Sequence, residues 1–202
     1  MASSSTEICN IALSHLGVGK EIANLETENS EEASACRRFY DIALEGTLRD
    51  FDWPFATKIA DLGLVEEDPN DEWTYSYRYP TDCVKVRRLL SGERNDTHQS
   101  RQPYRIARDT SGRLVFTDLE DAQVEYTVLV EDPGQYPSDF TMALSLRIAI
   151  YVAPRITGGD PFKLGSRAEE MYRVILGKAQ ASAFNEEQPD VLPESEFIRA
   201  RE

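Results

Sequence analysis

The chain has 202 residues, of which 41% are hydrophobic, and its 36 acidic and 22 basic residues give a formal net charge of −14. This length and apolar content suit one large domain, or a core domain with an inserted part. The charge argues against binding of duplex DNA by a basic face, because affinity for phosphates requires clustered Lys and Arg. It is typical of a soluble protein, of one with a basic partner, or of a surface that DNA passes without sticking.

The cysteines and the first residues indicate where the chain is made. Cys9, Cys36 and Cys83 are an odd number and form no CxxC pair, which argues against a disulfide framework and a zinc site. The opening MASSSTEIC has neither a basic n-region nor an apolar h-region, so we expect no secretory signal. Synthesis in a reducing cytoplasm follows from both.

Two helices are expected at the N-terminal end. The first begins near Thr6, with apolar residues at helical spacing, and Gly17 is its natural stop. The second opens at Asn29 with Glu32 three residues later, the spacing of a capping box. Pro54 ends it, since proline forces the residue before it out of the helical region.

The apolar period then changes from 3.6 to 2 residues. Short alternating segments rich in Val, Tyr, Phe and Leu are separated by turn signals such as DTSG at 109–112 and DLED at 118–121. We expect one antiparallel sheet of about five or six strands here, with no parallel crossover helix.

Helical periodicity returns at Ser138. Residues 140–156 form the most apolar run, but charges and a proline interrupt it, so it predicts a buried helix rather than a membrane span. Asp160 followed by Pro161 predicts the start of the last helix. Its buried stripe is expected to be Leu164, Ala168, Met171, Ile175, Ala179 and Ser182.

These elements predict an α+β fold, an antiparallel four-helix bundle with an inserted antiparallel β-sheet and an extended C-terminal tail. The bundle is expected from residues 1–55 and 133–185, the β-rich insertion from 56–132 and the arm from 186–202. Bulky residues gather at the exit from bundle to insertion, and we expect a structural joint there rather than a ligand-binding site. They are Phe51, Trp53, Pro54 and Phe55.

The sequence offers no constellation of catalytic residues. His15 falls on the apolar face of the first helix, and His98 lies in a polar loop without a partner at metal-ligand or triad spacing. GVGK at 17–20 departs from a phosphate-binding loop at both flanks. Most acids fall in turns and on helix exteriors, where solvation is the default. We therefore expect no enzyme, no metal and no cofactor.

The C-terminal SEFIRARE combines large apolar residues with arginines, whereas disordered ends usually lack large apolar residues. Such a cluster can fold onto a partner chain, with aromatic and Arg side chains as anchors. An ordinary frayed terminus, or one that folds back on its own bundle, is the alternative.

Several motifs follow one another in a fixed order. A short helix ends in LG, a linker contains LE, a helix carries C-x-x-x-Y-D, and W-x-F-A marks its exit. Later come YVAPRITGG after an apolar helix, an amphipathic last helix, and a tail that ends in an apolar-AR motif. In this order and spacing the chain resembles the phage head-to-tail adaptor (connector) family, in particular the podophage tail tubular protein A type.

The resemblance implies a structural virion protein, a helical bundle with a β-rich insertion and no catalysis or cofactor. About twelve copies would form a ring beneath the portal and receive the tail nozzle. DNA would pass through without sequence-specific binding, and no membrane would be involved. The protein would reside in the neck or tail of the virion, and in the host cytoplasm during assembly. The arm would dock on the portal through Leu192, Phe197, Ile198, Arg199 and Arg201.

Two other functions are weighed against the adaptor. The acidic chain could be a soluble binding or regulatory module, such as a DNA mimic that competes for a basic partner. The many carboxylates also permit a peptidoglycan-cleaving muramidase, although no motif indicates one.

Overall fold

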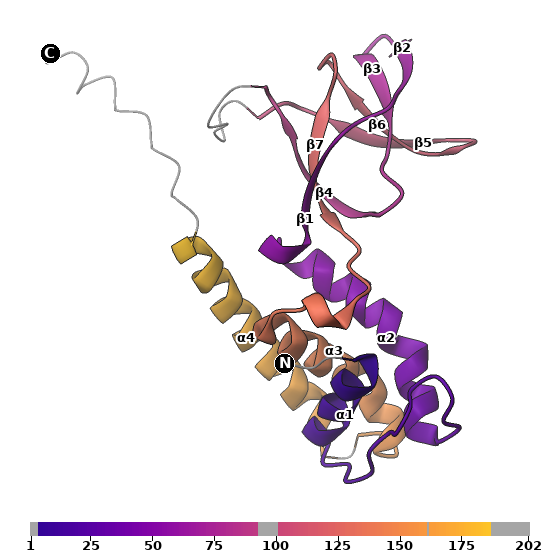
Figure 1. The fold of residues 1–202 in the computed structure, drawn as a ribbon, viewed down its shortest axis with the longest axis vertical. Coiled ribbons are helices and arrows are strands. Elements are labelled where there is room, and N and C mark those ends of the chain that lie inside the picture. The colour runs from indigo at the N-terminus through magenta and orange to yellow at the C-terminus, as the bar shows by residue number, and fades with distance from the viewer. Residues whose placement is uncertain (1–3, 93–100, 161, 187–202) are drawn as a thin grey trace, which may run out of the picture.

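The computed structural model describes residues 4–92, 101–160 and 162–186 (Figure 1). Within them the helices come from the two ends of the chain and the strands from its middle. The helices are α1 (Ser5–His15), α2 (Glu31–Asp50), α3 (Ser138–Ile156) and α4 (Leu164–Glu186), with short 3-10 helices η1 (Pro54–Ala56) and η2 (Pro133–Gln135). The strands are β1 (Thr57–Asp61), β2 (Leu64–Asn70), β3 (Trp73–Arg78), β4 (Cys83–Leu90), β5 (Arg105–Asp109), β6 (Gly112–Thr117) and β7 (Gln123–Val128).

The described strands form two antiparallel sheets, with strand orders β1-β7-β4 and β2-β3-β6-β5. The fold is α+β, and the prediction of a four-helix bundle with one inserted sheet is wrong. β1 and β2 are separated only by Leu62 and Gly63, but they belong to different sheets, so that Thr57 lies opposite Thr127 in one sheet and Leu64 opposite Tyr77 in the other. Alternation marks a strand but does not select its partner, and the β1–β7 pairing joins distant parts of the chain.

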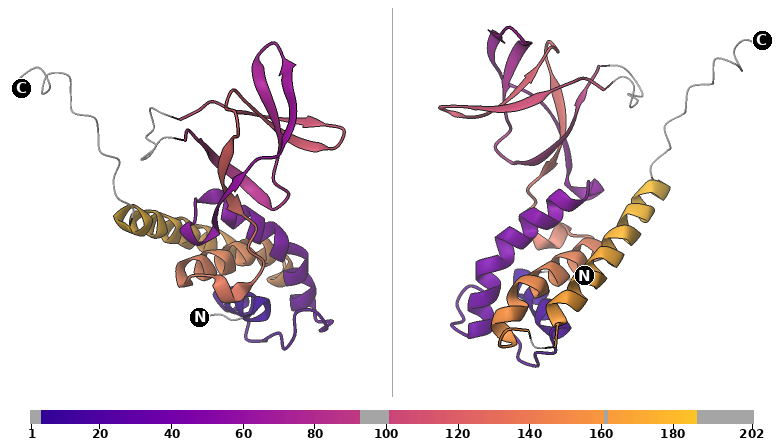
Figure 2. Two further views of the ribbon diagram at one scale, coloured as in Figure 1. Left: turned by 45° about the horizontal axis from the view of Figure 1, so that its top comes forward. Right: turned by 180° about the vertical axis from the view of Figure 1, so that it is seen from behind.

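The helices are grouped around α3, against which α1, α2 and α4 each pack. In Figures 1 and 2, α2 and α4 lie on opposite sides of it. α3 buries side chains almost all round, including Phe140, Leu144, Ile148 and Val152, which confirms the predicted buried helix. This central position explains why an apolar run need not be a membrane span.

The helix starts differ in detail from those expected. α2 is capped by Ser30, whose hydroxyl accepts from the Ala33 N–H at 3.2 Å, so Asn29 is not the cap. Asp160 does serve the start of α4, because its carboxylate accepts from the N–H groups of Leu164 and Gly165 at 2.6 and 2.9 Å. Its neighbour Pro161 lies outside the described residues.

The buried stripe of α4 also differs from the prediction. Ser182 is exposed, and Met171 is 39% exposed, whereas Tyr172 is buried. Tyr172 can be buried because its hydroxyl donates to the Asp50 carboxylate at 2.7 Å and accepts from Arg147 at 3.0 Å. Because the hydroxyl is hydrogen-bonded, burial of Tyr172 does not leave an unsatisfied polar group in the core.

The described residues have two hydrophobic cores. One fills the space between the helices and reaches into β4, where Val84 belongs to it. The other lies between the sheets and includes Leu89, Val115, Val124 and Tyr126. The turns predicted at 109–112 and 118–121 connect strands at the rim of this second core, β5 to β6 and β6 to β7, and are confirmed.

Candidate functional site

The chain leaves α2 for β1 through an aromatic cluster centred on Trp53. Trp53 is 1% exposed, and its indole N–H donates to the Thr47 carbonyl at 2.8 Å, which folds the chain back on the last turn of α2. Its ring meets those of Phe51 and Phe140 edge to face, with centroids 5.1 and 5.0 Å apart. The Phe55 ring meets Phe140 in the same way at 4.8 Å. Each such pair contributes about 0.5–1.5 kcal/mol beyond burial.

The returning segment meets the exit at the same cluster. Tyr136, just before α3, has its ring centroid 6.0 Å from that of Phe55, and its hydroxyl donates to the Val130 carbonyl at 2.7 Å. Burial raises the pKa of the Tyr136 hydroxyl to about 12. Pro54 is exposed at the start of η1, where a missing N–H costs nothing. Both crossings between helices and strands therefore share one packed contact.

Arg87 of β4 is a component of this crossing that sequence reasoning missed. Its guanidinium donates to the Trp53 carbonyl at 2.8 Å, to Thr57 Oγ1 at 2.6 Å and to Thr127 Oγ1 at 3.0 Å. Its side chain is 9% exposed although it lies in an alternating segment that reads as half solvated. Hydrogen bonds to a charged group contribute about 1.5–3 kcal/mol, so Arg87 fixes the crossing to both β1 and β7.

A second, half-buried arginine ties three helices together. Arg147 of α3 donates to Asp50 of α2 and to the Tyr172 hydroxyl of α4, and Gly46 of α2 leaves room for its guanidinium. Burial and the neighbouring Asp50 carboxylate raise the pKa of Tyr172 to about 12. The sequence showed Arg147 only as a charge within an apolar run.

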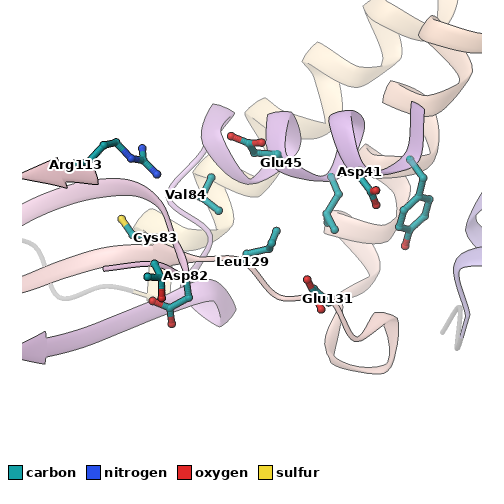
Figure 3. A pocket seen from close by; sticks show the side chains of 11 residues that line it. Asp41, Glu45, Asp82, Cys83, Val84, Arg113, Leu129 and Glu131 are labelled. Carbon is teal, nitrogen blue, oxygen red and sulfur yellow. The ribbon is translucent and has the colours of Figure 1, made fainter. Parts of the chain in front are cut away.

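A groove of about 590 Å³ opens where α2 meets the strands (Figure 3). We call it the acidic groove and define it by Asp41, Glu45, Asp82 and Glu131. In Figure 3, Asp41 and Glu45 stand on α2, while Glu131 lies on the segment that follows β7. Apolar side chains lie between these carboxylates, namely Leu44, Val84 and Leu129.

The carboxylates of the acidic groove differ in how many hydrogen-bond and ion-pair partners they have. Asp82 accepts from Lys58 Nζ at 2.6 Å and from the Tyr126 hydroxyl at 2.8 Å, and these partners lower its pKa against the opposing effect of burial. Oε1 of Glu45 lies 3.5 Å from Nη1 of Arg49, with which it forms an ion pair. Asp41 and Glu131 have no hydrogen-bond or ion-pair partner among the described residues.

Among the described residues that line the groove, Arg113 is the one cation, and its guanidinium stacks on the Tyr79 ring at 4.0 Å. Leu129 is 38% exposed, so part of the apolar floor faces solvent. The described part of the groove therefore presents apolar surface between negative charges, a combination that suits a partner carrying both apolar and cationic side chains.

The expected portal-docking residues cannot be placed beside these features. Leu192, Phe197, Ile198, Arg199 and Arg201 lie outside the described residues, as does His98.

His15 is half-buried on α1, and its Nε2 has no hydrogen-bond partner among the described atoms. Burial lowers the pKa of its imidazole, which favours the neutral form in the folded chain.

The acidic groove had no signal in the sequence. Its residues come from α2, the start of β4, β6 and the segment after β7, and no local pattern predicts that these meet. Within the described ranges, no group of three or more His, Cys, Asp and Glu residues is placed to hold a metal ion.

The helices of the described ranges lack the combination of length and apolarity that a membrane crossing needs. No model of a known protein family matches the chain, and a search of curated proteins gives no match.

Proposed function

We propose that this chain is a structural virion protein, a ring-forming head-to-tail adaptor that joins the portal to the tail nozzle and continues the DNA conduit. The observation that carries the proposal is the distribution of exposed apolar side chains over both the helices and the strands. An adaptor needs apolar contact surface on several sides, because it meets neighbouring copies, the portal and the nozzle.

The exposed apolar residues occur on both the strands and the helices. On the strands and the segment after them they are Ile59, Leu64, Val65, Ile106 and Leu129. On and beside the helices they are Ile42, Met142, Phe162, Met171 and Val174.

The motifs that resemble the adaptor family support the proposal from the sequence side. W-x-F-A supplies the buried Trp53 and the half-buried Phe55, and the tyrosine of C-x-x-x-Y-D is Tyr40, which packs in the helical core. In the proposal, residues 1–55 and 133–185 form the body of the ring, and residues 56–132 are a second unit that Phe51, Trp53, Pro54 and Phe55 join to it.

Residues 186–202 form an arm that docks on the portal through Leu192, Phe197, Ile198, Arg199 and Arg201. Many arms on one symmetric portal add their binding through effective concentration, so each contact can be weak. The charge of −14 keeps DNA from sticking to the passage, because like charges repel. The chain needs no catalytic residue or cofactor for this role, and its place is the virion neck.

The proposal is tested by native mass spectrometry of the chain mixed with the portal encoded beside it. We expect about twelve copies per portal, as a symmetric ring requires, and loss of binding when the chain ends before Gln188. The double variant Phe197→Ala with Ile198→Ala should lose at least tenfold in affinity. Its matched control, Glu194→Ala with Glu196→Ala, should bind the portal as the wild type does.

A wild-type chain that never associates with the portal would contradict the adaptor. The net charge and the acidic groove would then favour the acidic binding module. Such a module predicts a stable monomer or dimer that competes with nucleic acid for a basic protein.

A further inference from the structure

One flank of α4 carries a cationic and apolar stripe in an otherwise acidic chain. Arg167, Met171, Val174 and Lys178 follow one another at i, i+4, i+7 and i+11, which places them in one row along the helix. We call this row the α4 flank. No acidic residue occupies these four positions, and the two apolar residues stand between the two cations.

The described residues leave the α4 flank uncovered. α4 buries a narrow stripe that includes Ala168, Tyr172 and Ala179, whereas Met171 is 39% and Val174 is 56% exposed. Arg167 and Lys178 are exposed as well, and no ion pair joins either of them to another described residue. An exposed apolar pair framed by free cations is typical of a contact surface.

The acidic groove has the complementary arrangement. Its apolar floor lies between Asp41 and Glu45 on one side and Glu131 on the other (Figure 3). Met171 and Val174 can cover the exposed part of Leu129, while the cations at the two ends meet the carboxylates. Charge complementarity of this kind fixes the register of two surfaces and disfavours wrong partners.

The two surfaces lie on different sides of the protein. In Figures 1 and 2, α2 and α4 run along opposite sides of α3, and α2 carries half of the acidic groove. A contact between different surfaces of identical chains is heterologous, and it forms a closed ring when the rotation between copies returns to the start.

We propose that the α4 flank of one copy binds the acidic groove of the next copy, and that this contact builds the ring. The inference rests on the proposed function for the ring itself, but the surfaces and the partner, a second copy of this chain, follow from the charges and exposures above. Arg113 stacks on Tyr79, and no ion pair joins it to these carboxylates among the described residues.

Charge reversal tests the contact. Arg167→Glu with Lys178→Glu should raise the concentration needed to form rings on the portal at least tenfold, and so should Asp41→Lys with Glu131→Lys, which reverses one carboxylate on each side of the groove. A chain that combines all four substitutions should form rings at a concentration within about threefold of the wild-type value, because the attraction between the two surfaces is then re-formed with the charges exchanged. A purely structural effect of the substitutions would not be rescued in this way.

The matched control is Arg155→Glu with Arg173→Glu, which changes the net charge equally at exposed cations away from the α4 flank. It should assemble as the wild type does. Unchanged assembly of the reversed flank, or no rescue by the fourfold variant, overturns the inference while rings of the wild type still support the adaptor.

Sedimentation of the free chain at high concentration separates the remaining outcomes. Self-association of the wild type that follows the same reversal and rescue, without any portal binding, supports the contact and contradicts the adaptor. No self-association and no ring on the portal overturns both. Thermal melts of every variant identify any that fail to fold.

Discussion

At the scale of single residues, Trp53 and Trp73 separate the contribution of burial to stability from the contribution of hydrogen bonding. Both carry an indole N–H that is shielded from solvent, but only that of Trp53 has an acceptor, the Thr47 carbonyl. The Nε1 of Trp73 is buried without a partner among the described atoms. Removal of a paired donor leaves its acceptor unsatisfied, whereas removal of an unpaired donor leaves nothing behind.

Trp53→Phe should therefore lower the free energy of unfolding by about 2–4 kcal/mol, from the lost ring volume and the orphaned Thr47 carbonyl. Trp73→Phe is the matched control and should cost less than about 1.5 kcal/mol, since no hydrogen bond is lost and Trp73 is only half-buried. Urea denaturation followed by circular dichroism measures both. Equal losses in the two variants would contradict the assigned role of the indole hydrogen bond.

At the scale of elements, the contact between α2 and α3 depends on a position without a side chain. A Cβ on Gly46 would lie 2.7–2.9 Å from the guanidinium atoms of Arg147. That guanidinium is held by Asp50 and Tyr172, so it cannot move aside without losing both partners. Gly177 of α4 is the opposite case, because a Cβ there meets nothing within 4 Å.

Gly46→Ala should reduce the free energy of unfolding by about 1 kcal/mol, because the displaced hydrogen bonds of Arg147 outweigh the gain in helix propensity. Gly177→Ala should raise it by about 0.5–1 kcal/mol through that propensity alone. Thermal and urea denaturation of the two variants give the comparison. Stabilisation by both substitutions would show that Arg147 is free to move.

The same elements explain how far the sequence could predict the fold. Period and capping residues located α3, α4 and most strands, because those signals are local. The separation of the strands into two sheets was missed, since Gly63 marks a break but does not indicate the distant strand β7 that pairs with β1. The predicted buried stripe included Met171 and left out Tyr172, because the partners of Tyr172 come from two other helices.

The candidate sites also differ in whether a local sequence pattern could predict them. The bulky residues around Trp53 were visible as a local cluster beside a proline. Arg87 and the acidic groove were not, because their meaning depends on which distant carbonyls and carboxylates come close in the fold. Spacing alone also could not show that Met171 and Val174 stay exposed.

At the scale of the whole molecule, the helical core and the sheet core meet through few contacts. The chain crosses between them twice, at residues 51–56 and 129–137, and both crossings pack on the aromatic cluster around Trp53. The exposed pair of Lys85 with Asp52 adds little, because solvent screens such pairs. The hydrogen bonds of Arg87 to the crossing therefore carry much of the coupling.

Arg87→Met should loosen this coupling without removing either core. The thioether side chain replaces the apolar stem of arginine, but the Trp53 carbonyl and the threonine hydroxyls lose their charged donor. Hydrogen exchange followed by mass spectrometry should show α3 and β7 opening together in the wild type, and β7 opening first in the variant. Arg88→Met is the control, because Arg88 is the neighbour of Arg87 on β4 and pairs with Glu125 of β7 within the sheet at 2.8 Å. If Arg88→Met separated the two cores as strongly as Arg87→Met, the coupling would belong to the stability of the sheet rather than to the crossing. If β7 and α3 opened together in all three proteins, the aromatic cluster alone would be sufficient to join the two cores.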